Sequence, residues 1–236
     1  MRKAAIGKSV TVILPTLNEA ENIGKILSML HGAYPTAEII VADDGSDDGT
    51  QEIVRKISAK RKNVSLLDRR RRREHGLTAS VIEAAFAARG EYIVVMDADL
   101  QHPVEKAGSL LAGLDNSDLS IGIRSYVKDW GLKRMAISKS VAFLAYISFA
   151  ARGRPVCNDM MSGFFAIKKK TMMEIAGHNK EKFVGKGYKI LLDILRLSPK
   201  GIKISEARYS AFHKRRKGRS KLGPKHVIYT LASVFS

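Results

Sequence analysis

The sequence predicts a single α/β domain in which a mainly parallel, doubly wound sheet carries helices on both faces. Short apolar runs rich in β-branched residues alternate with longer segments whose apolar residues recur at helical spacing, as expected for repeated β-α-β units. Several of these runs end abruptly in carboxylates, which is typical of buried strands that deliver charge to the rim of a sheet. The chain has 236 residues, of which 45% are hydrophobic, and this suits one soluble core.

The first half of the chain shows the alternation most clearly. The apolar runs predict strands at Val10 to Leu14, Ile39 to Ala42, Val64 to Leu67, Tyr92 to Met96 and Leu119 to Ile123. Helical spacing, as in Ile23, Ile26, Leu27 and Leu30, predicts helices at Ala20 to Leu30, Gly49 to Lys60, Leu77 to Ala88 and Val104 to Leu114.

The pattern changes after Arg124. A long amphipathic helix is expected from Lys133 to Ala151, polar at its start and apolar afterwards. A strand from Ser162 to Ile167 follows, and then come helices at Thr171 to Ala176 and Tyr188 to Leu197 and a strand at Ile202 to Tyr209. The chain closes with a basic segment, His213 to Lys225, and an apolar one, Val227 to Phe235.

Polar residues follow three of the predicted strands, at 15–19, 43–45 and 97–99. Ligands of open α/β sheets bind at the carboxyl ends of the strands, so we expect these segments to converge. Residues two apart on a strand point to the same side, and Asp97, Asp99 and Gln101 would then present oxygens to one ion. The alternative is a strand end followed by an Asp helix cap, with Pro103 at the first helical position.

The composition restricts the partners. A net charge of +18 indicates a polyanionic ligand or surface, but only 7% of residues are aromatic and they do not interleave with the basic clusters. Stacking on nucleic-acid bases is therefore poorly supported, and anionic lipid or a phosphorylated ligand fits better.

Neither a Gly-x-Gly-x-x-Gly turn nor a Walker-type loop occurs. The single cysteine, Cys157, excludes an intrachain disulfide and is expected to be a small buried hydrophobe. No run reaches the roughly 20 apolar residues of a spanning helix.

The acidic segments, taken in order, resemble the signatures of family-2 glycosyltransferases. They read Leu14-Pro15-Thr16-Leu17-Asn18-Glu19, Asp43-Asp44-Gly45-Ser46-Asp47-Asp48-Gly49-Thr50 and Asp97-Ala98-Asp99-Leu100-Gln101-His102-Pro103. Later motifs agree, namely residues 121–124, 161–164 and 215–222. Within that family the chain most resembles dolichyl-phosphate mannose synthases and related polyprenyl-phosphate glycosyltransferases. The resemblance implies a GT-A type catalytic domain over residues 1–224.

The resemblance also implies a donor site and a metal site. The donor nucleotide would lie against Pro15, Thr16, Asn18, Glu19, Asp43, Asp44, Gly76, Leu77, Asp97 and Ala98. The metal, Mg²⁺ or Mn²⁺, would be held by Asp99 and Gln101 with Asp97 beside the diphosphate. Without these motifs the acidic turn at 43–48 would be a solvated helix cap.

Cations are needed on the acceptor side, because a polyprenyl phosphate carrying roughly −1.5 to −2 must approach an anionic diphosphate. The resemblance places Arg124, Arg134, Ser138, Arg215 and Lys221 around the acceptor phosphate. It counts Asp97, Asp99, Arg124 and Asp193 as catalytic. Asp193 would orient the acceptor or its arginines, and its alternative is an ordinary helix-surface Asp. An ionised phosphate needs no general base, so His75, His102 and His213 are interpreted as surface or loop residues.

The implied reaction is inverting, metal-dependent transfer of a hexose, mannose from GDP-mannose in the first place, to dolichyl or polyprenyl phosphate. Phe165 stands where mannose synthases often have arginine. A polyprenyl-phosphate glucosyltransferase or another enzyme using a UDP-sugar is therefore the alternative. A basic nucleic-acid-binding protein is the rival from a different class, although rim carboxylates would repel a phosphate backbone.

Two segments extend beyond the family pattern. The five arginines at 69–73 are interpreted as a mobile basic loop, which would attract donor phosphates or anionic lipid or would simply be a solvated charge run. Residues 225–236 are expected to touch the membrane or to begin an anchor that continues beyond them, and an anchoring subunit is the other option. The helix at Val141 to Phe149 would either lie in the membrane interface or pack against the sheet as an ordinary helix, and the enzyme would work at the cytoplasmic face of a membrane.

Overall fold

The computed structural model describes residues 9–127, 143–179, 182–183 and 190–211. Its strands are β1 (Val10–Thr16), β2 (Glu38–Asp43), β3 (Val64–Asp68), β4 (Tyr92–Val95), β5 (Leu119–Val127), β6 (Phe165–Lys168) and β7 (Ile204–Ala211). Its helices are α1 (Ala20–Ala33), α2 (Thr50–Ser58), α3 (Leu77–Ala87), the 3₁₀ turn η1 (Val104–Lys106), α4 (Ala107–Gly113), α6 (Lys169–Asn179) and α7 (Ile190–Leu197). Residues 143–151 are also helical.

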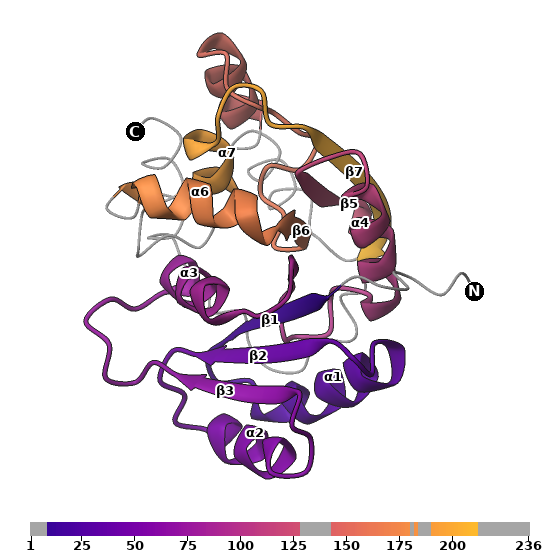
Figure 1. Cartoon of the computed structure of the whole chain (residues 1–236), viewed down its shortest axis with the longest axis vertical. Coiled ribbons are helices and arrows are strands. Elements are labelled where there is room, and N and C mark those ends of the chain that lie inside the picture. Colours follow the sequence, from indigo (N-terminus) through magenta and orange to yellow (C-terminus); the bar gives the residue numbers. More distant parts are fainter. Residues whose placement is uncertain (1–8, 128–142, 180–181, 184–189, 212–236) are drawn as a thin grey trace.

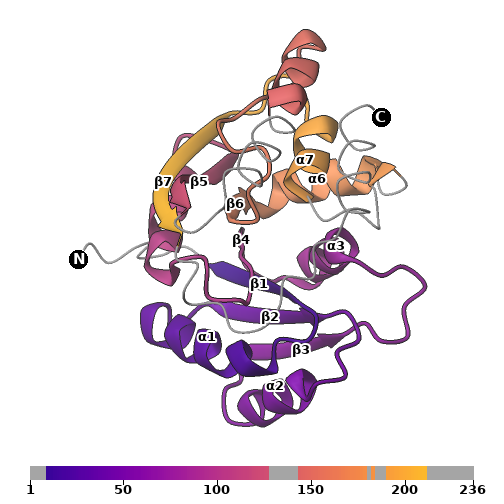
Figure 2. The same cartoon turned by 180° about the vertical axis from the view of Figure 1, so that it is seen from behind.

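The strands form one sheet in the order β3-β2-β1-β4-β6-β5-β7. Strands β1 to β4 pair in parallel with one another, and β5 pairs in parallel with β7 at the outer edge, as Figure 2 shows. Strand β6 runs antiparallel to both of its neighbours, β4 and β5. The predicted α/β fold with a mainly parallel sheet is confirmed.

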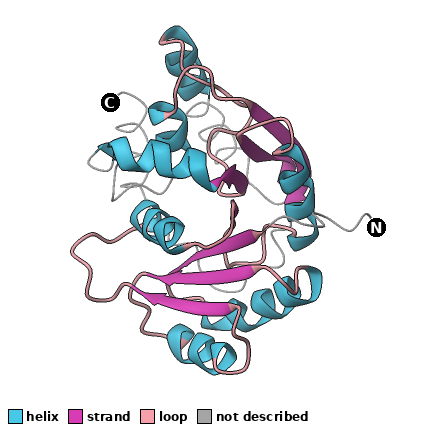
Figure 3. Cartoon of the chain, viewed as in Figure 1, coloured by secondary structure: helices cyan, strands magenta, loops and turns pink. Residues whose placement is uncertain are grey.

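Two hydrophobic cores lie on opposite faces of this sheet, because successive strand residues point to opposite sides. On β1, Val12 and Leu14 join the core that α1, α2 and α4 cover, whereas Ile13 joins the core that α3, α6 and α7 cover. Figures 1 and 3 show α1 and α2 on one side of β1, β2 and β3, with α3 on the other. The second core also takes up Cys157, and burial raises the pKa of its thiol to about 12. Helices on both faces and a buried cysteine are therefore as predicted.

The strand order places the polar segments together. Strands β2, β1 and β4 are adjacent and parallel, so their carboxyl ends open at one edge of the sheet. In this register Thr16, the last residue of β1, lies opposite Asp43, the last residue of β2. The Asp44 N–H then donates to the Thr16 carbonyl at 2.9 Å. The sheet thus brings the first two acidic segments into contact.

Some predicted elements differ from the structure. The predicted helix from Val104 begins as the 3₁₀ turn η1 and continues as α4. Strand β6 begins at Phe165, three residues after the predicted start, because Ser162 and Gly163 belong to the preceding loop. Strand β4 ends at Val95, so residues 97–101 lie in a loop. The prediction that strand alternation aligns Asp97, Asp99 and Gln101 is therefore wrong.

The helix at 143–151 is the described part of the expected amphipathic helix, and residues 133–142 lie outside the described ranges. Ala145 and Phe149 are buried and belong to the core that α3, α6 and α7 cover. The opposite side carries four large apolar side chains that are 44 to 63% exposed: Phe143, Leu144, Tyr146 and Ile147. Within the ranges described, no helix has the length and apolarity needed to cross a bilayer.

Candidate active site

The loop after β1 is joined to the loop after β2 by hydrogen bonds. The backbone N–H of Asn18 donates to Ser46 Oγ at 2.7 Å, and the N–H of Asp47 donates to Asn18 Oδ1 at 3.0 Å. The Glu19 N–H donates to Thr50 Oγ1 at 2.9 Å. Asn18 has φ 52°, in the left-handed region that asparagine tolerates better than most residues. Asn18 and Glu19 are thus held beside the second acidic segment.

Asp43 is fully buried and organises its own loop. Its Oδ1 accepts the backbone N–H of Ser46 at 2.9 Å and a side-chain N–H of Gln51 at 2.6 Å, while Oδ2 accepts the Ser46 hydroxyl. A buried carboxylate needs such partners, because an unpaired charge in the interior is costly. Asp43 therefore stabilises the conformation of its own loop through these hydrogen bonds. Its contact with the nucleoside stays a prediction.

Asp48 bridges the first turns of two helices. Its Oδ2 accepts the Ala20 N–H at 2.9 Å, at the start of α1, and its Oδ1 accepts the Thr50 N–H at 3.0 Å, at the start of α2. Partial burial opposes ionisation, but the hydrogen bonds from Thr50 and Ala20 outweigh it and lower the pKa of Asp48. The N-termini of α1 and α2 also favour the ionised form of Asp48, because a helix N-terminus attracts negative charge.

We expect Asp48 to make folding stability depend on pH. Because its pKa is lower in the folded chain, its contribution is complete above the usual aspartate pKa of about 3.9 and is lost as the pH falls through the lower folded value. The difference in unfolding free energy between the wild type and Asp48→Asn should therefore shrink from pH 6 to pH 2.5, measured by urea unfolding. Asp68 and Asp118, whose pKa values are also lowered, are present in both proteins. A difference that stays constant with pH would contradict this role.

The Gly76–Leu77 loop is tied to Asp44. The Gly76 N–H donates to Asp44 Oδ2 at 2.6 Å, and His75 Nδ1 lies 3.1 Å from Asp44 Oδ1. Gly76 has φ 127°, a backbone conformation that only glycine adopts readily. Three predicted donor residues, Asp44, Gly76 and Leu77, are therefore brought together at one place.

Arg69 lies at the centre of this region, and its side chain is only 2% exposed. The guanidinium pairs with Asp44, donates from Nε to Glu83 at 3.0 Å and from Nη1 to Ser80 Oγ at 2.9 Å. Nη2 donates to the Glu74 carbonyl at 2.7 Å. The interpretation of residues 69–73 as one mobile basic loop is wrong for Arg69, while the arginines at 70–73 are exposed. Arg69 instead cross-links the ends of β2 and β3 to α3.

The third acidic segment forms a turn between β4 and η1. The Gln101 N–H donates to Asp99 Oδ1 at 3.1 Å, and Leu100 takes φ 65°. The Asp97 carboxylate lies above Gly163, where an added Cβ would come within 3.1 Å of Asp97 Oδ2. The Ser162-Gly163 motif therefore leaves room for Asp97, whose side chain is 38% exposed.

This turn has the donor chemistry that a hard cation requires, since Asp97, Asp99 and Gln101 offer oxygen atoms only. Across the described ranges, however, no three His, Cys, Asp or Glu side chains are grouped so as to hold a metal. The fit to Mg²⁺ or Mn²⁺ thus rests on the two carboxylates together with the Gln101 amide. The predicted ligands share one turn, and their coordination of a cation stays a prediction.

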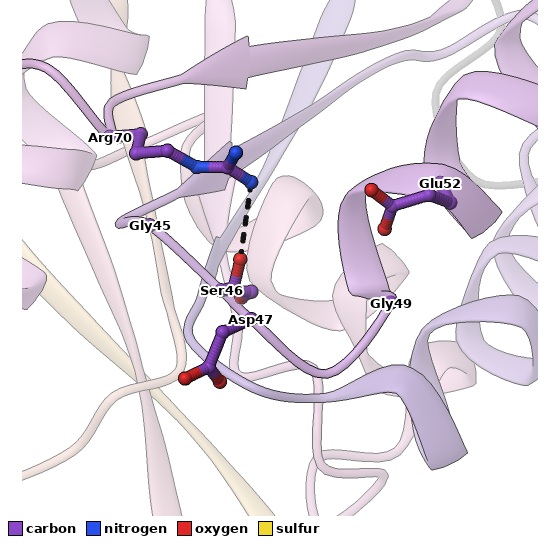
Figure 4. Close-up of a pocket in the computed structure, with 6 residues that line it drawn as sticks. All are labelled: Gly45, Ser46, Asp47, Gly49, Glu52 and Arg70. Atoms are coloured by element: carbon purple, nitrogen blue, oxygen red, sulfur yellow. Dashed lines mark hydrogen bonds between the residues drawn. The ribbon is translucent and has the colours of Figure 1, made fainter.

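A pocket of about 570 Å³ opens beside the second acidic segment (Figure 4). It is lined by Gly45, Ser46, Asp47, Gly49, Glu52 and Arg70. In Figure 4 the Arg70 side chain reaches across the pocket, and its Nη2 donates to the Ser46 carbonyl at 3.3 Å. Neither Asp97 nor Asp99 lines this pocket. The pocket therefore lies next to expected donor-binding residues but does not include the expected metal-binding carboxylates.

Arg124, in the second half of β5, forms a bidentate ion pair with Asp159. Nε donates to Oδ2 at 2.7 Å and Nη2 donates to Oδ1 at 2.9 Å. Burial alone would lower the pKa of Arg124, but Asp159 raises it, with smaller contributions from Tyr209 and Asp97. Arg124 and Asp97 therefore lie within electrostatic range of each other. Asp159 was missed in the sequence, although it lies only two residues before the motif at 161–164.

Asp193 is 1% exposed in α7, and Arg196 donates from Nη2 to its Oδ1 at 3.1 Å. Its interpretation as an ordinary helix-surface Asp is therefore wrong, and its role near the acceptor stays a prediction. The other expected acceptor residues lie outside the described ranges: Arg134, Ser138, Arg215 and Lys221.

The sequence of the chain matches a known protein family. A family model described as Glycosyl transferase family 2 matches residues 11–175, which is more than half of the chain. The chain belongs to glycosyl transferase family 2. The match includes all three acidic loops at the carboxyl edge of the sheet, and it confirms the family resemblance of the sequence motifs.

Two proteins that are similar to this chain carry the same name. A dolichol-phosphate mannosyltransferase from Pyrococcus furiosus is 36% identical over 234 residues, covering 96% of this chain and 62% of the relative. The enzyme of the same name from Saccharomyces cerevisiae is 32% identical over 235 residues, covering 94% of this chain and 84% of the relative. The chain thus spans less than two thirds of the length of the Pyrococcus protein.

Solved structures of other glycosyltransferases share the fold. A glucosyl-3-phosphoglycerate synthase from Mycobacterium tuberculosis, in complex with Mn²⁺, UDP and glucosyl-3-phosphoglycerate, gives a TM-score of 0.69 at 19% identity, covering 97% of this chain and 80% of that one. A mannosyl-3-phosphoglycerate synthase from Rubrobacter xylanophilus gives 0.69 at 17% identity, covering 97% and 73%. These identities are low, so the likeness establishes the GT-A-like fold alone.

Proposed function

We propose that this family-2 glycosyltransferase moves a hexose, mannose from GDP-mannose in the first place, onto a dolichyl or other polyprenyl phosphate with inversion at the anomeric carbon. The observation that carries the proposal is the 32 to 36% identity to dolichol-phosphate mannosyltransferases over nearly the whole chain. The geometry is consistent with it, because three loops with nucleotide-binding chemistry open at the carboxyl edge of one sheet.

On the donor side, the chain's own residues bind and orient the nucleotide. The loops containing Asn18, Asp43 and Asp44 are cross-linked before any ligand arrives, so little ordering is required on binding. Pro15 and Thr16 end β1 directly beneath these loops, and Gly76 and Leu77 close them from the side of α3. This preorganised edge would hold the nucleoside.

Asp99 and Gln101 would hold Mg²⁺ or Mn²⁺, with Asp97 beside them against the diphosphate, while Ala98 between the two carboxylates is buried in the core. A cation bound there supplies Lewis-acid stabilisation of the leaving nucleoside diphosphate. The Mn²⁺ in the glucosyl-3-phosphoglycerate synthase complex supports a divalent cation in a site of this fold.

On the acceptor side, Arg124 would bind the lipid phosphate while Asp159 holds its guanidinium in place. The phosphate oxygen is itself the nucleophile, so it attacks without a general base, while Asp193 would orient the basic groups around it. Arg134, Ser138, Arg215 and Lys221 would complete the cradle.

A polyprenyl phosphate is embedded in a bilayer, so we place the reaction at the cytoplasmic surface of a membrane. Exposed Phe143, Leu144, Tyr146 and Ile147, followed by the exposed Arg152, form an apolar patch with a basic border. Together with a net charge of +18, this suits a surface that contains anionic lipid.

A donor panel tests the proposal. The full chain is mixed with vesicles containing a polyprenyl phosphate and anionic lipid, Mn²⁺ and either GDP-mannose or UDP-glucose, each radiolabelled in the sugar. We expect labelled lipid from GDP-mannose and little from UDP-glucose, and an Asp97→Ala chain serves as the blank. Label from UDP-glucose alone would replace the mannose assignment by the glucosyltransferase. No labelled lipid together with salt-sensitive retention on RNA or DNA would favour a nucleic-acid-binding protein instead.

A further inference from the structure

His102 ends the acidic turn that follows β4, and it is a buried residue, only 7% exposed. Its interpretation as a surface residue is therefore wrong, although it does lie in a loop. The imidazole ring stacks on Phe164 with ring centroids 5.1 Å apart and planes inclined by 12°. The edge of Tyr209 closes the other approach at 6.0 Å. Phe164 and Tyr209 also meet edge to face at 5.3 Å, so three rings from three segments form one cluster.

Both nitrogens of His102 face Asp97. The backbone N–H of Asp97 donates to His102 Nδ1 at 3.0 Å, so Nδ1 acts as an acceptor and carries no proton. The ring proton must then be on Nε2 in the neutral imidazole. Nε2 lies 3.7 Å from Asp97 Oδ2, too long for a strong hydrogen bond but close enough for the N–H dipole to attract the carboxylate.

The cluster also fixes the turn relative to the rest of the site. Phe164 follows Gly163, the residue over which the Asp97 carboxylate lies, and Tyr209 lies opposite Arg124 in the pairing of β5 with β7. His102 therefore connects the donor turn to the segments that carry the acceptor side. The ring holds His102 in place by stacking on Phe164, and its two nitrogens interact with Asp97.

We propose that His102 is a positioning residue that sets the orientation of Asp97, through the acceptor at Nδ1 and the N–H at Nε2, while its stack on Phe164 fixes the ring. The catalytic part of this inference rests on the proposed function. Outer partners of this kind hold a functional carboxylate in the productive geometry, and their loss commonly costs about 10- to 100-fold in activity or metal affinity.

Two variants separate the effect of stacking on Phe164 from the effect of the ring nitrogens on Asp97. His102→Phe keeps a planar ring against Phe164 but has neither nitrogen, and His102→Asn keeps a δ-position acceptor for the Asp97 N–H. We expect His102→Phe to lower kcat about 10- to 100-fold with an unchanged KM for the lipid phosphate, and His102→Asn, which keeps the acceptor but neither the Nε2–H nor the ring, to recover only part of the loss. His178→Phe, on the exposed side of α6, is the matched control and should be unchanged.

Nuclear magnetic resonance of the ¹⁵N-labelled chain provides a readout that is independent of activity. Two-bond ¹H–¹⁵N spectra should show Nδ1 of His102 unprotonated and Nε2 protonated, and the Asp97 amide should exchange slowly in the wild type and His102→Asn but fast in His102→Phe. A proton on Nδ1, or normal kcat in a folded His102→Phe, would overturn the inference. A wild type that is inactive with every donor overturns the proposed function instead, and the tautomer and exchange measurements then still decide on the geometry.

Discussion

Arg69→Met is expected to lower the free energy of unfolding by about 3 kcal/mol or more, because removing one member of a buried ion pair leaves the others uncompensated. The Arg69 side chain is 2% exposed, and its loss would leave the 10%-exposed Asp44 without its guanidinium partner. Methionine preserves the apolar stem of the side chain, so the change removes mainly the guanidinium group with its charge and hydrogen bonds. Urea unfolding followed by far-ultraviolet circular dichroism measures the effect.

Arg72→Met is the matched control for Arg69→Met. Arg72 pairs with the same Glu83 but is 56% exposed, and exposed pairs contribute about 0 to 1 kcal/mol. If both substitutions shifted the urea midpoint equally, the ion-pair cluster around Arg69 would not be the element that stabilises this region. Because Asp44 also holds the Gly76 N–H, we expect Arg69→Met to raise the KM for the nucleotide donor as well.

The second large effect is expected from Asp99→Asn, which should reduce transfer by at least about 100-fold. A bound cation stabilises transition-state charge by several kcal/mol, and each 1.36 kcal/mol corresponds to tenfold in rate. Asparagine keeps an oxygen that can accept the Gln101 N–H, so the turn should persist while its negative charge is lost. Initial rates across a Mn²⁺ titration, with the donor and lipid phosphate saturating, measure the effect.

Asp115→Asn is the control for Asp99→Asn, since Asp115 is an exposed acid at the end of α4 and has no place in the site. It should leave the rate unchanged. Near-normal turnover of Asp99→Asn at saturating Mn²⁺ would remove Asp99 from the metal site. An unchanged urea midpoint in both variants would show that the loss of rate is not a loss of folding.

The layered architecture follows from local sequence, because hydrophobic periodicity depends on neighbours along the chain. Residues 10–14 and 39–42 were predicted as strands and lie within β1 and β2. The direction of β6 was not predictable in this way, since nothing in Phe165–Lys168 encodes which way it crosses the sheet.

In the site, too, the sequence motifs were predictable and the contacts between distant residues were not. The acidic loops are contiguous motifs, so their position at the carboxyl edge was predictable. Arg69 is the first of five identical residues, and only contacts with Asp44 and Glu83 distinguish it from its neighbours. Arg124 and Asp159 are 35 positions apart, and His102 meets Tyr209 from the far edge strand. Such pairings arise from the folded sheet, which periodicity and motif spacing do not describe.

The hydrogen bonding of the second acidic segment changes what its four aspartates mean for an incoming anion. Asp43 is saturated by its own loop, Asp44 is matched by a buried guanidinium, and Asp48 faces two helix N-termini. Arg69 compensates the charge of Asp44, but Asp43 and Asp48 are held by neutral N–H and O–H donors, which leave their negative charge in place, and Asp47 is exposed. The run therefore keeps most of its negative charge, and a nucleoside diphosphate approaching it would need a cation between the two anions.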